Sequence, residues 1–264
     1  MTNATLFEYE DHWPTELGGV SVVDGTVTFR GHDLLNALED LSWMDLLMYG
    51  ITGRRFSQAQ LELFQGLWKI SCSYPEPRIW NNRVAALGGS VRSSAGLSLG
   101  AAIAVTDATI YGQRPMIGAF DFLQRAHAAR QSGIAIEEFI VRELKTHRTI
   151  PGYGRPIRNV DERLAPIERL ARRLDLWNGP YTQIAFEVAG VLRAYRQGMN
   201  VAALTAGLTA EQGVSVVEFR RMAILAFSAG LIHCELDASN HPEGALFPLR
   251  CDRVTYNGPA RRTW

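Results

Sequence analysis

The chain has little cysteine, little lysine and no excess of charge of either sign. Its three cysteines, Cys72, Cys234 and Cys251, form neither a CxxC pair nor a metal-ligand spacing. Lys plus Arg (27) equals Asp plus Glu (27), which argues against a nucleic-acid partner. The sequence therefore predicts reduced thiols, no metal site, no nucleic-acid partner and a cytoplasmic location.

No segment has the pattern of a signal peptide or a membrane span. The N-terminal residues lack a basic region followed by an apolar stretch. The apolar run from Leu97 to Val105 is too short to cross a bilayer, and Asp107 soon follows it. With 47% apolar and 20% charged residues, the composition is that of a globular domain with a core, and no membrane partner is expected.

Strand signals are nearly absent. The exception is Val20 to Phe29, where β-branched residues surround Asp24-Gly25 and predict a hairpin. Helical spacing dominates afterwards, as after the predicted N-cap Ser57, and no strands alternate with the helices. We predict an all-α fold with a short N-terminal β-hairpin, in which Val216 to Leu236 forms a central buried helix.

Two clusters of glycine and proline interrupt the helices. They lie at Gly112 to Pro115 and at Ile150 to Ile157, and the two prolines and two glycines of the second prevent a continuous helix. Helices on either side of such breaks can hinge. We predict a large helical domain formed by residues 1–111 plus 221–264, and a small domain formed by residues 112–220.

The second break carries the most specific pattern in the chain. Gly152 and Gly154 permit a tight loop with exposed backbone N–H groups, and Arg155 and Arg158 add positive charge. Residues 161–163 are expected to open the next helix, whose N-terminus favours anions. The pattern predicts an anion site; the alternative is an ordinary helix–helix loop with surface arginines.

Five segments, in order along the chain, resemble the citrate synthase family, and the last resembles the tail of its short citryl-CoA lyase-like members. They are residues 29–34 (FRGHDL), the small-residue region after Arg83, residues 150–163 (IPGYGRPIRNVDER), residues 229–237 (AGLIHCELD) and residues 252–259 (DRVTYNGP). The similarity spans nearly the whole chain.

The resemblance implies a citrate synthase fold, with large and small helical domains in a homodimer and an active site in the cleft between them. The small-residue helix Val84 to Val105 suits close packing between subunits. Family members condense an acyl-CoA with a keto acid, or cleave citryl-CoA. A carboxylate removes a proton, histidines stabilise the enolate and polarise the keto group, and arginines hold substrate carboxylates. No cofactor is implied, and a coenzyme A thioester is a possible substrate.

This chain departs from the family pattern at the histidines. Arg155 stands at the position of the loop histidine, Tyr111 stands near a second family histidine, and a third falls near Tyr74 or Ser73. Glu211 falls at the catalytic aspartate, and Phe227 replaces a substrate arginine. The resemblance thus implies Glu211, Arg155 and Tyr111 as catalytic residues. It implies as substrate contacts Arg158, Arg163, Tyr74, Tyr153, Gly152, Gly154, His147 and Phe227.

Three functional hypotheses follow. In the first, the chain is a repurposed acyltransferase or lyase that forms or breaks a C–C bond in a CoA thioester or small carboxylate, with Glu211 as the base. Alternatively, it is a non-catalytic ligand-binding relative. In the third hypothesis it is an intact citryl-CoA lyase or citrate synthase-type enzyme that uses His147 or His233.

The replacement of the loop histidine by Arg155 changes what this position can do. An arginine stays charged near neutral pH, so Arg155 can hold an anion but cannot shuttle a proton.

Overall fold

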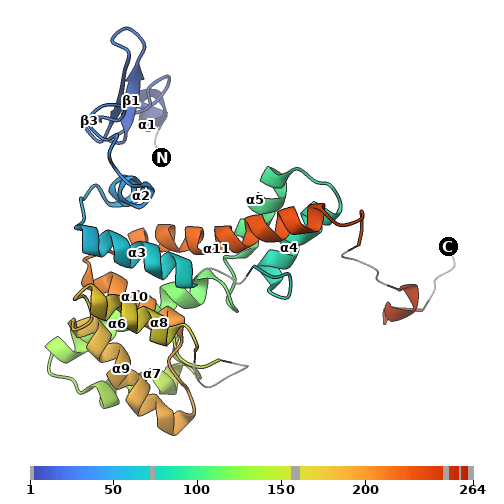
Figure 1. Ribbon diagram of the computed structural model, residues 1–264. Helices are drawn as coiled ribbons and strands as arrows, with labels where there is room; N and C mark the ends of the chain where they lie inside the picture. Colours follow the sequence, from blue (N-terminus) through green and yellow to red (C-terminus); the bar gives the residue numbers. More distant parts are fainter. Residues whose placement is uncertain (1–2, 72–74, 156–160, 246–249, 256, 261–264) are drawn as a thin grey trace.

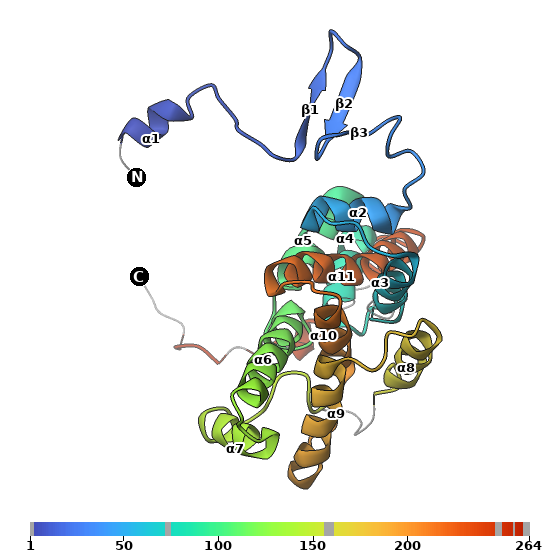
Figure 2. The same cartoon turned by 90° about the vertical axis from the view of Figure 1, so that its left-hand side faces the viewer.

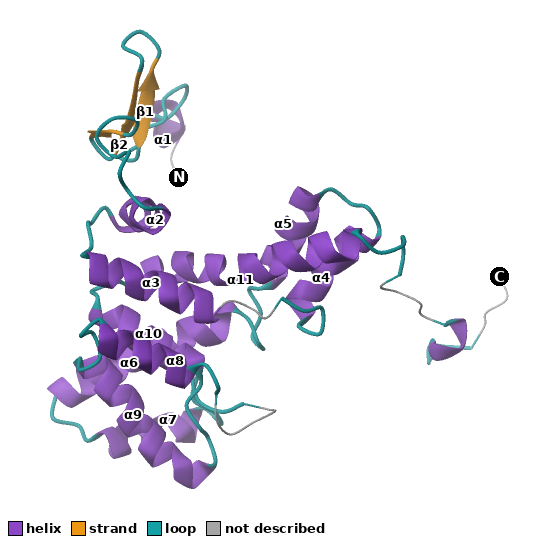
Figure 3. Ribbon diagram, viewed as in Figure 1, coloured by secondary structure: helices purple, strands orange, loops and turns teal. Residues whose placement is uncertain are grey.

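The computed structural model describes residues 3–71, 75–155, 161–245, 250–255 and 257–260. Almost all of its regular structure is helical (Figure 3). The helices are α1 Asn3–Glu8, α2 Trp43–Thr52, α3 Gln58–Ser71, α4 Trp80–Ser90, α5 Ala95–Val105, α6 Gln113–Gln131, α7 Ile136–Thr146, α8 Leu164–Arg173, α9 Pro180–Leu192, α10 Val201–Glu211 and α11 Val216–Ser239. Short 3-10 turns follow α9 and α11 at Arg193–Tyr195 and Cys251–Arg253.

The predicted hairpin is confirmed. Strands β1 (Gly18–Ser21) and β2 (Thr26–Phe29) pair antiparallel, and β3 (His32–Asp33) adds to β2. Gly25 has a φ of 64° at the turn, a conformation that glycine adopts without strain. The two views show this small sheet projecting from the helical body beyond α2 (Figures 1 and 2), and Phe29 at the end of β2 packs edge-on against Tyr49 of α2.

Local signals set several helix ends. Ser57 accepts a hydrogen bond from the Gln60 N–H (3.3 Å), so α3 begins where the predicted N-cap placed it. Ser215 and Glu218 form a capping box at the start of α11. A break lies between α5 and α6 and another between α7 and α8. The first was predicted at Gly112 to Pro115, but Gln113, Arg114 and Pro115 form the first turn of α6, where proline is tolerated. Residues 156 and 157 of the second lie outside the described residues.

The main core lies where α6, α9 and α10 pack together beneath α3 and α8. Phe64 of α3 and Phe120 and Phe122 of α6 are among its largest fully buried side chains. The cluster continues into α2 and the first half of α11. Residues on both sides of the predicted domain boundaries therefore share one apolar core, and the division into two domains stays a prediction.

Helix α11 was expected to be a central buried helix, and for the single chain that expectation is wrong. One face packs against α3, α4, α5 and α6. The other leaves Val217, Ile232 and Leu236 48–57% exposed. By length and composition alone α11 could span a membrane, but core helices of globular proteins pass the same test, and a third of its apolar window is buried inside the molecule.

The predicted small-residue helix from Val84 to Val105 is in fact two helices. Arg92 adopts a left-handed conformation (φ 58°) between α4 and α5, and Ser94 caps α5 by accepting from the Leu97 N–H. The small residues still serve close packing. A Cβ at Gly88 would lie 2.0 Å from Oγ of Ser98, so α4 and α5 touch there.

Candidate functional site

The predicted anion loop lies between α6 and α10. Gly152 and Gly154 have φ values of 88° and 91°, which a residue with a side chain adopts only with strain. A Cβ at Gly152 would lie 2.8 Å from Cβ of Ala203 on α10 and 3.0 Å from Cβ of Ala119 on α6. Glycine at this position thus allows the loop to approach both helices.

Asn200 ties this loop to the start of α10. Its backbone N–H donates to the Gly152 carbonyl (2.9 Å), and its Nδ2 donates to the Gly154 carbonyl (3.0 Å). Its Oδ1 accepts from the Ala202 N–H and so caps α10. The sequence pattern around residue 150 gives no sign of this contact, because Asn200 lies 46 residues beyond Gly154.

The loop N–H groups are not all available to a ligand. The Tyr153 N–H donates to the Ile150 carbonyl (3.1 Å), and the Gly154 N–H donates to the Gly198 carbonyl (2.6 Å). The expectation of exposed backbone donors is therefore wrong for Tyr153 and Gly154. The positive charge of the arginines remains as the means of holding an anion.

Tyr153 points into the core. Its side chain is buried, its hydroxyl donates to the Ala185 carbonyl (2.9 Å), and its ring packs edge-on against Phe122. Burial raises the pKa of the Tyr153 phenol far above its usual value. In this arrangement Tyr153 anchors the loop to the core. Its side chain can contact a substrate, as predicted, only if the core around it opens.

An ion-pair network places Arg155 and Arg163 together beside the loop. The Asp161 side chain is fully buried and accepts from Arg163 Nε and Nη2, both at 2.9 Å, and from the Val201 N–H at 2.8 Å. Arg155 lies 2.6 Å from the Glu162 carboxylate and 3.7 Å from Asp161.

The network also fixes the charge of Asp161. Burial opposes its ionisation, but the hydrogen bonds and charge of Arg163 and the Val201 N–H outweigh this effect, so the pKa of Asp161 lies below its usual value. A charged Asp161 therefore joins the loop arginines to the start of α10. The structure thus brings together four predicted site residues, Gly152, Gly154, Arg155 and Arg163.

Glu211 lies at the opposite end of α10. Ten residue steps separate Val201 from Glu211, which corresponds to about 15 Å of helix. The Glu211 carboxylate accepts from the Thr182 N–H (2.9 Å) at the start of α9. It fills the space above Gly179, where a Cβ would lie 2.0 Å from the Glu211 carboxyl carbon. The structure therefore does not bring Glu211 together with Arg155.

The surroundings of Glu211 set a pH dependence of stability. Burial raises the pKa of Glu211 above 4.5, against the opposing effect of backbone hydrogen bonds from Thr182 and Tyr181. A raised folded-state pKa contributes stability below pH 4.5 that is lost as the pH rises through the folded value. We expect Glu211→Gln to gain stability relative to the parent protein as the pH rises from 4 to 7, measured by urea unfolding. A relative gain toward low pH would contradict this assignment.

The remaining predicted site residues are scattered or lie outside the described residues. Tyr111 is half exposed, with a φ of 52°, in the turn before α6. His147 is exposed at the end of α7, and Phe227 is buried on α11. Tyr74 and Arg158 lie outside the described residues. Tyr111 and Phe227 thus stand on other elements than the loop, whereas His147 lies at the end of α7, five residues before Gly152.

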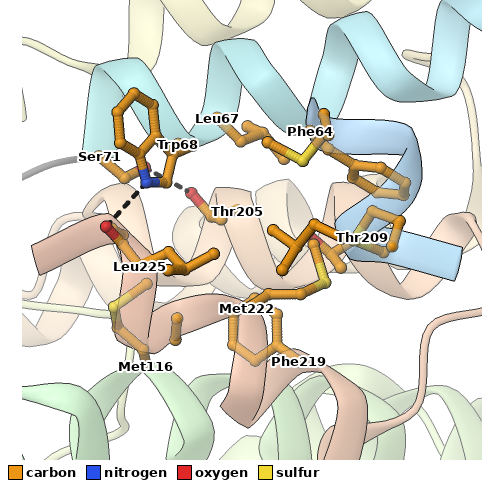
Figure 4. Close-up of a pocket in the computed structure, with 15 residues that line it drawn as sticks. Phe64, Leu67, Trp68, Ser71, Met116, Thr205, Thr209, Phe219, Met222 and Leu225 are labelled. Atoms are coloured by element: carbon orange, nitrogen blue, oxygen red, sulfur yellow. Dashed lines mark hydrogen bonds between the residues drawn. The ribbon is translucent and has the colours of Figure 1, made fainter. Parts of the chain in front are cut away.

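A small apolar cavity, which no sequence motif indicated, lies between α2, α3, α6, α10 and α11 (Figure 4). Its volume of about 40 Å³ is enough for a few water-sized molecules. Four methionines line it: Met44, Met48, Met116 and Met222. Its walls lie close in sequence to two predicted substrate contacts, because Ser71 precedes Tyr74 by three residues and Ala226 adjoins Phe227.

The polar groups at this cavity differ in their hydrogen bonding. The Ser71 and Thr205 hydroxyls lie 3.3 Å apart, and Trp68 Nε1 donates to the Leu225 carbonyl (2.7 Å). Thr209 is fully buried, and its Oγ1 has no hydrogen-bond partner within the described part of the chain. A buried hydroxyl without a partner costs about 1–3 kcal/mol.

We expect Thr209→Val to raise the free energy of unfolding by about 1 kcal/mol, since it removes this hydroxyl at nearly constant shape. Thr205→Val is the control and should lower stability, because it removes the Ser71 hydrogen bond. Chemical denaturation of the three proteins makes the comparison. A loss of stability in Thr209→Val would mean that a water in the cavity satisfies this hydroxyl.

Comparison with known proteins identifies the fold. No family model matches the sequence, and no curated protein matches it. Among solved structures, citryl-CoA lyase from Hydrogenobacter thermophilus superposes with a TM-score of 0.83 at 19% identity, covering 96% of this chain and 97% of that one. The ATP citrate lyase of Methanosaeta concilii, a D541A mutant in complex with (3S)-citryl-CoA, gives 0.76 at 18% identity, covering 98% of this chain and 45% of that one.

The citrate synthase of Thermoplasma acidophilum, in a ternary complex with carboxymethyl coenzyme A and oxaloacetate, gives a TM-score of 0.64 at 13% identity. It covers 84% of this chain and 58% of that one. The chain therefore has the citrate synthase fold, as the motifs predicted. Its length also corresponds to that of the citryl-CoA lyase, because the superposition covers nearly the full length of both chains.

Proposed function

We propose that this chain binds a coenzyme A thioester or a related small carboxylate at the Gly152 loop, without the acid–base chemistry that C–C cleavage needs. The proposal rests on the observation that each carboxylate described above already has an ion-pair or hydrogen-bond partner. Asp161 and Glu162 are paired with arginines, and Glu211 caps α9 about 15 Å away. The arginines can hold an anion, whereas Asp161 and Glu162, the two carboxylates described beside the loop, are held by those arginines rather than left to act as a base.

Ligand binding at this loop would proceed by exchange of anions. Arg155 rests on Glu162, whose side chain is about half exposed, so a ligand carboxylate can take its place. Asp161 is buried and holds Arg163 in place. The structural neighbours include a complex with (3S)-citryl-CoA and one with citrate and coenzyme A, which supports a ligand of this class.

The proposal predicts opposite effects for the two members of the exposed pair. Arg155→Gln should weaken binding about tenfold or more, because it removes a charge-assisted contact. Glu162→Gln should tighten binding, since it removes the competing carboxylate. Calorimetric titration with coenzyme A and citryl-CoA measures both, and mass spectrometry of the mixtures detects conversion. Absence of binding, or equal effects of the two substitutions, would overturn the proposal; conversion would overturn its non-catalytic part.

A second candidate is the repurposed enzyme, an acyltransferase or lyase of a CoA thioester with Glu211 as the base. The raised pKa of Glu211 and the nearby His127 favour it, because catalytic bases often have perturbed pKa values. In this case Glu211→Gln abolishes turnover while the protein remains folded, as circular dichroism would show. Turnover that persists in Glu211→Gln would eliminate Glu211 as the base.

The third candidate, an intact lyase or synthase, depends on His147 or His233. Both side chains are exposed, on α7's end and on α11. Replacement of both by glutamine should then abolish citryl-CoA cleavage. Cleavage that is unaffected would exclude this candidate.

We also propose that the chain is a cytoplasmic homodimer. Exposed apolar side chains gather on α5 and the neighbouring half of α11, where Leu97 is 73% and Leu236 57% exposed. Gly96 and Gly100 on α5 have open space at their Cβ positions, so another helix can approach closely. Analytical ultracentrifugation should give twice the 29.3 kDa chain mass, and Leu97→Asp should shift it toward the monomer. A monomeric parent protein would refute this assembly.

A further inference from the structure

A groove between α3 and α8 lies apart from the loop and from the apolar cavity. Its volume is about 370 Å³, within the range of small-molecule sites. Residues from two helices line it: Lys69 and Ile70 of α3, and Pro166, Arg169, Leu170 and Arg173 of α8. None of these residues belongs to the network around Asp161.

The close approach of the two helices shapes the apolar part of the groove. Gly66 on α3 faces Leu170 on α8, and a Cβ at Gly66 would lie 2.0 Å from Leu170 Cδ2. Ile70 and Leu170 are partly buried and pack against the main core. The groove therefore has an apolar wall that can accept a ring or a short chain.

Positive charge lies along the same groove. Arg169 and Arg173 are four residues apart on α8, so their guanidinium groups repel each other, and Lys69 stands on α3. Within the described residues, neither Arg169 nor Arg173 forms an ion pair. By contrast, Arg172 on the same helix is 2.8 Å from the Glu168 carboxylate.

We propose that the α3–α8 groove binds a small phosphate ester with an apolar body. Arginine presents its donors in a fork that matches phosphate oxygens, and Arg169 and Arg173 together can hold a dianion. Ile70, Pro166 and Leu170 would contact the ring or chain of the ester. This site is independent of the proposed ligand at the loop, where Arg155 and Arg163 are engaged by Glu162 and Asp161.

The experiment is a calorimetric titration with phenyl phosphate and with inorganic phosphate at two salt concentrations. We expect phenyl phosphate to bind more tightly than phosphate because of the apolar wall, and both affinities to fall with salt. The double variant Arg169→Gln/Arg173→Gln should bind phenyl phosphate at least tenfold more weakly. Arg172→Gln, with the same charge change on the same helix, should leave binding unchanged.

Failure of the parent protein to bind phenyl phosphate would overturn the inference, as would equal affinity in the double variant. If the double glutamine variant is unfolded by circular dichroism, Arg169→Lys/Arg173→Lys replaces it and should weaken binding while it keeps the salt dependence. Arg155→Gln separates the two proposals, since it should affect coenzyme A and not phenyl phosphate. If Arg155→Gln weakens both ligands equally, the groove is not a separate site.

Discussion

Replacement of Asp161 by asparagine is expected to lower the free energy of unfolding by about 3–5 kcal/mol, the cost of leaving one partner of a buried ion pair without the other. The Asp161 carboxylate accepts hydrogen bonds from Arg163 and from the Val201 N–H, and its side chain is fully buried. An asparagine side chain replaces one carboxylate oxygen by an NH2 group. This group would face at least one of these N–H donors and cannot accept a hydrogen bond from it. Arg163 would then keep its charge in a largely buried position after losing the buried carboxylate that it contacts.

Glu162→Gln is the matched control. Glu162 pairs with Arg155 in the same network, but its side chain is 48% exposed. Exposed ion pairs contribute about 0–1 kcal/mol, so this variant should unfold close to the parent protein. Urea denaturation with equal m-values measures the difference. Similar losses in the two variants would mean that burial of Asp161 does not determine its contribution.

The acid side of the stability curve offers an independent measurement of the same network. The pKa of Asp161 is depressed in the folded state, so its contribution is present above its ordinary value of 3.8 and is lost as the pH falls through the folded value. The difference in stability between the parent protein and Asp161→Asn should therefore be largest near neutral pH and shrink below about pH 4. A difference that grows on acidification would contradict a charged Asp161.

Features with a local physical cause were predictable from the sequence. The hairpin depended on Asp24-Gly25, and the break after α7 on the glycines and prolines of residues 150–157. The citrate synthase fold followed from five motifs in order, although each alone is weak. Gly152 and Gly154 in fact have positive φ, as a tight glycine loop requires.

Features that depend on distant contacts were not predictable. The contact of Glu211 with the start of α9 depends on the room that Gly179 leaves for its carboxylate, and motif order gives no sign of it. The catalytic role of Glu211 stays a prediction. The loop N–H groups bond to Ile150 and Gly198, a pairing that motif order alone does not predict. The cavity and the α3–α8 groove carry no local motif, since each arises where helices far apart in sequence pack together.

The contact of the loop with α6 and α10 gives the second large prediction, a difference between two neighbouring glycines. Gly152→Ala should lower the free energy of unfolding by about 2–5 kcal/mol, because left-handed strain of about 1–2 kcal/mol adds to overpacking of about 1–3 kcal/mol. The new Cβ would lie 2.8 Å from Cβ of Ala203 and 3.0 Å from that of Ala119. Neither methyl group can rotate out of the way.

Gly154→Ala isolates the backbone contribution. Gly154 has nearly the same φ, 91° against 88°, but nothing lies within 4 Å of a Cβ placed there. This variant should lose only about 1–2 kcal/mol. Urea unfolding of both variants measures the difference between their free energies of unfolding. This difference is the free energy needed to move α6 and α10 apart around the loop. Equal losses would show that backbone strain alone requires glycine at residue 152, and that the two helices yield to an added methyl group.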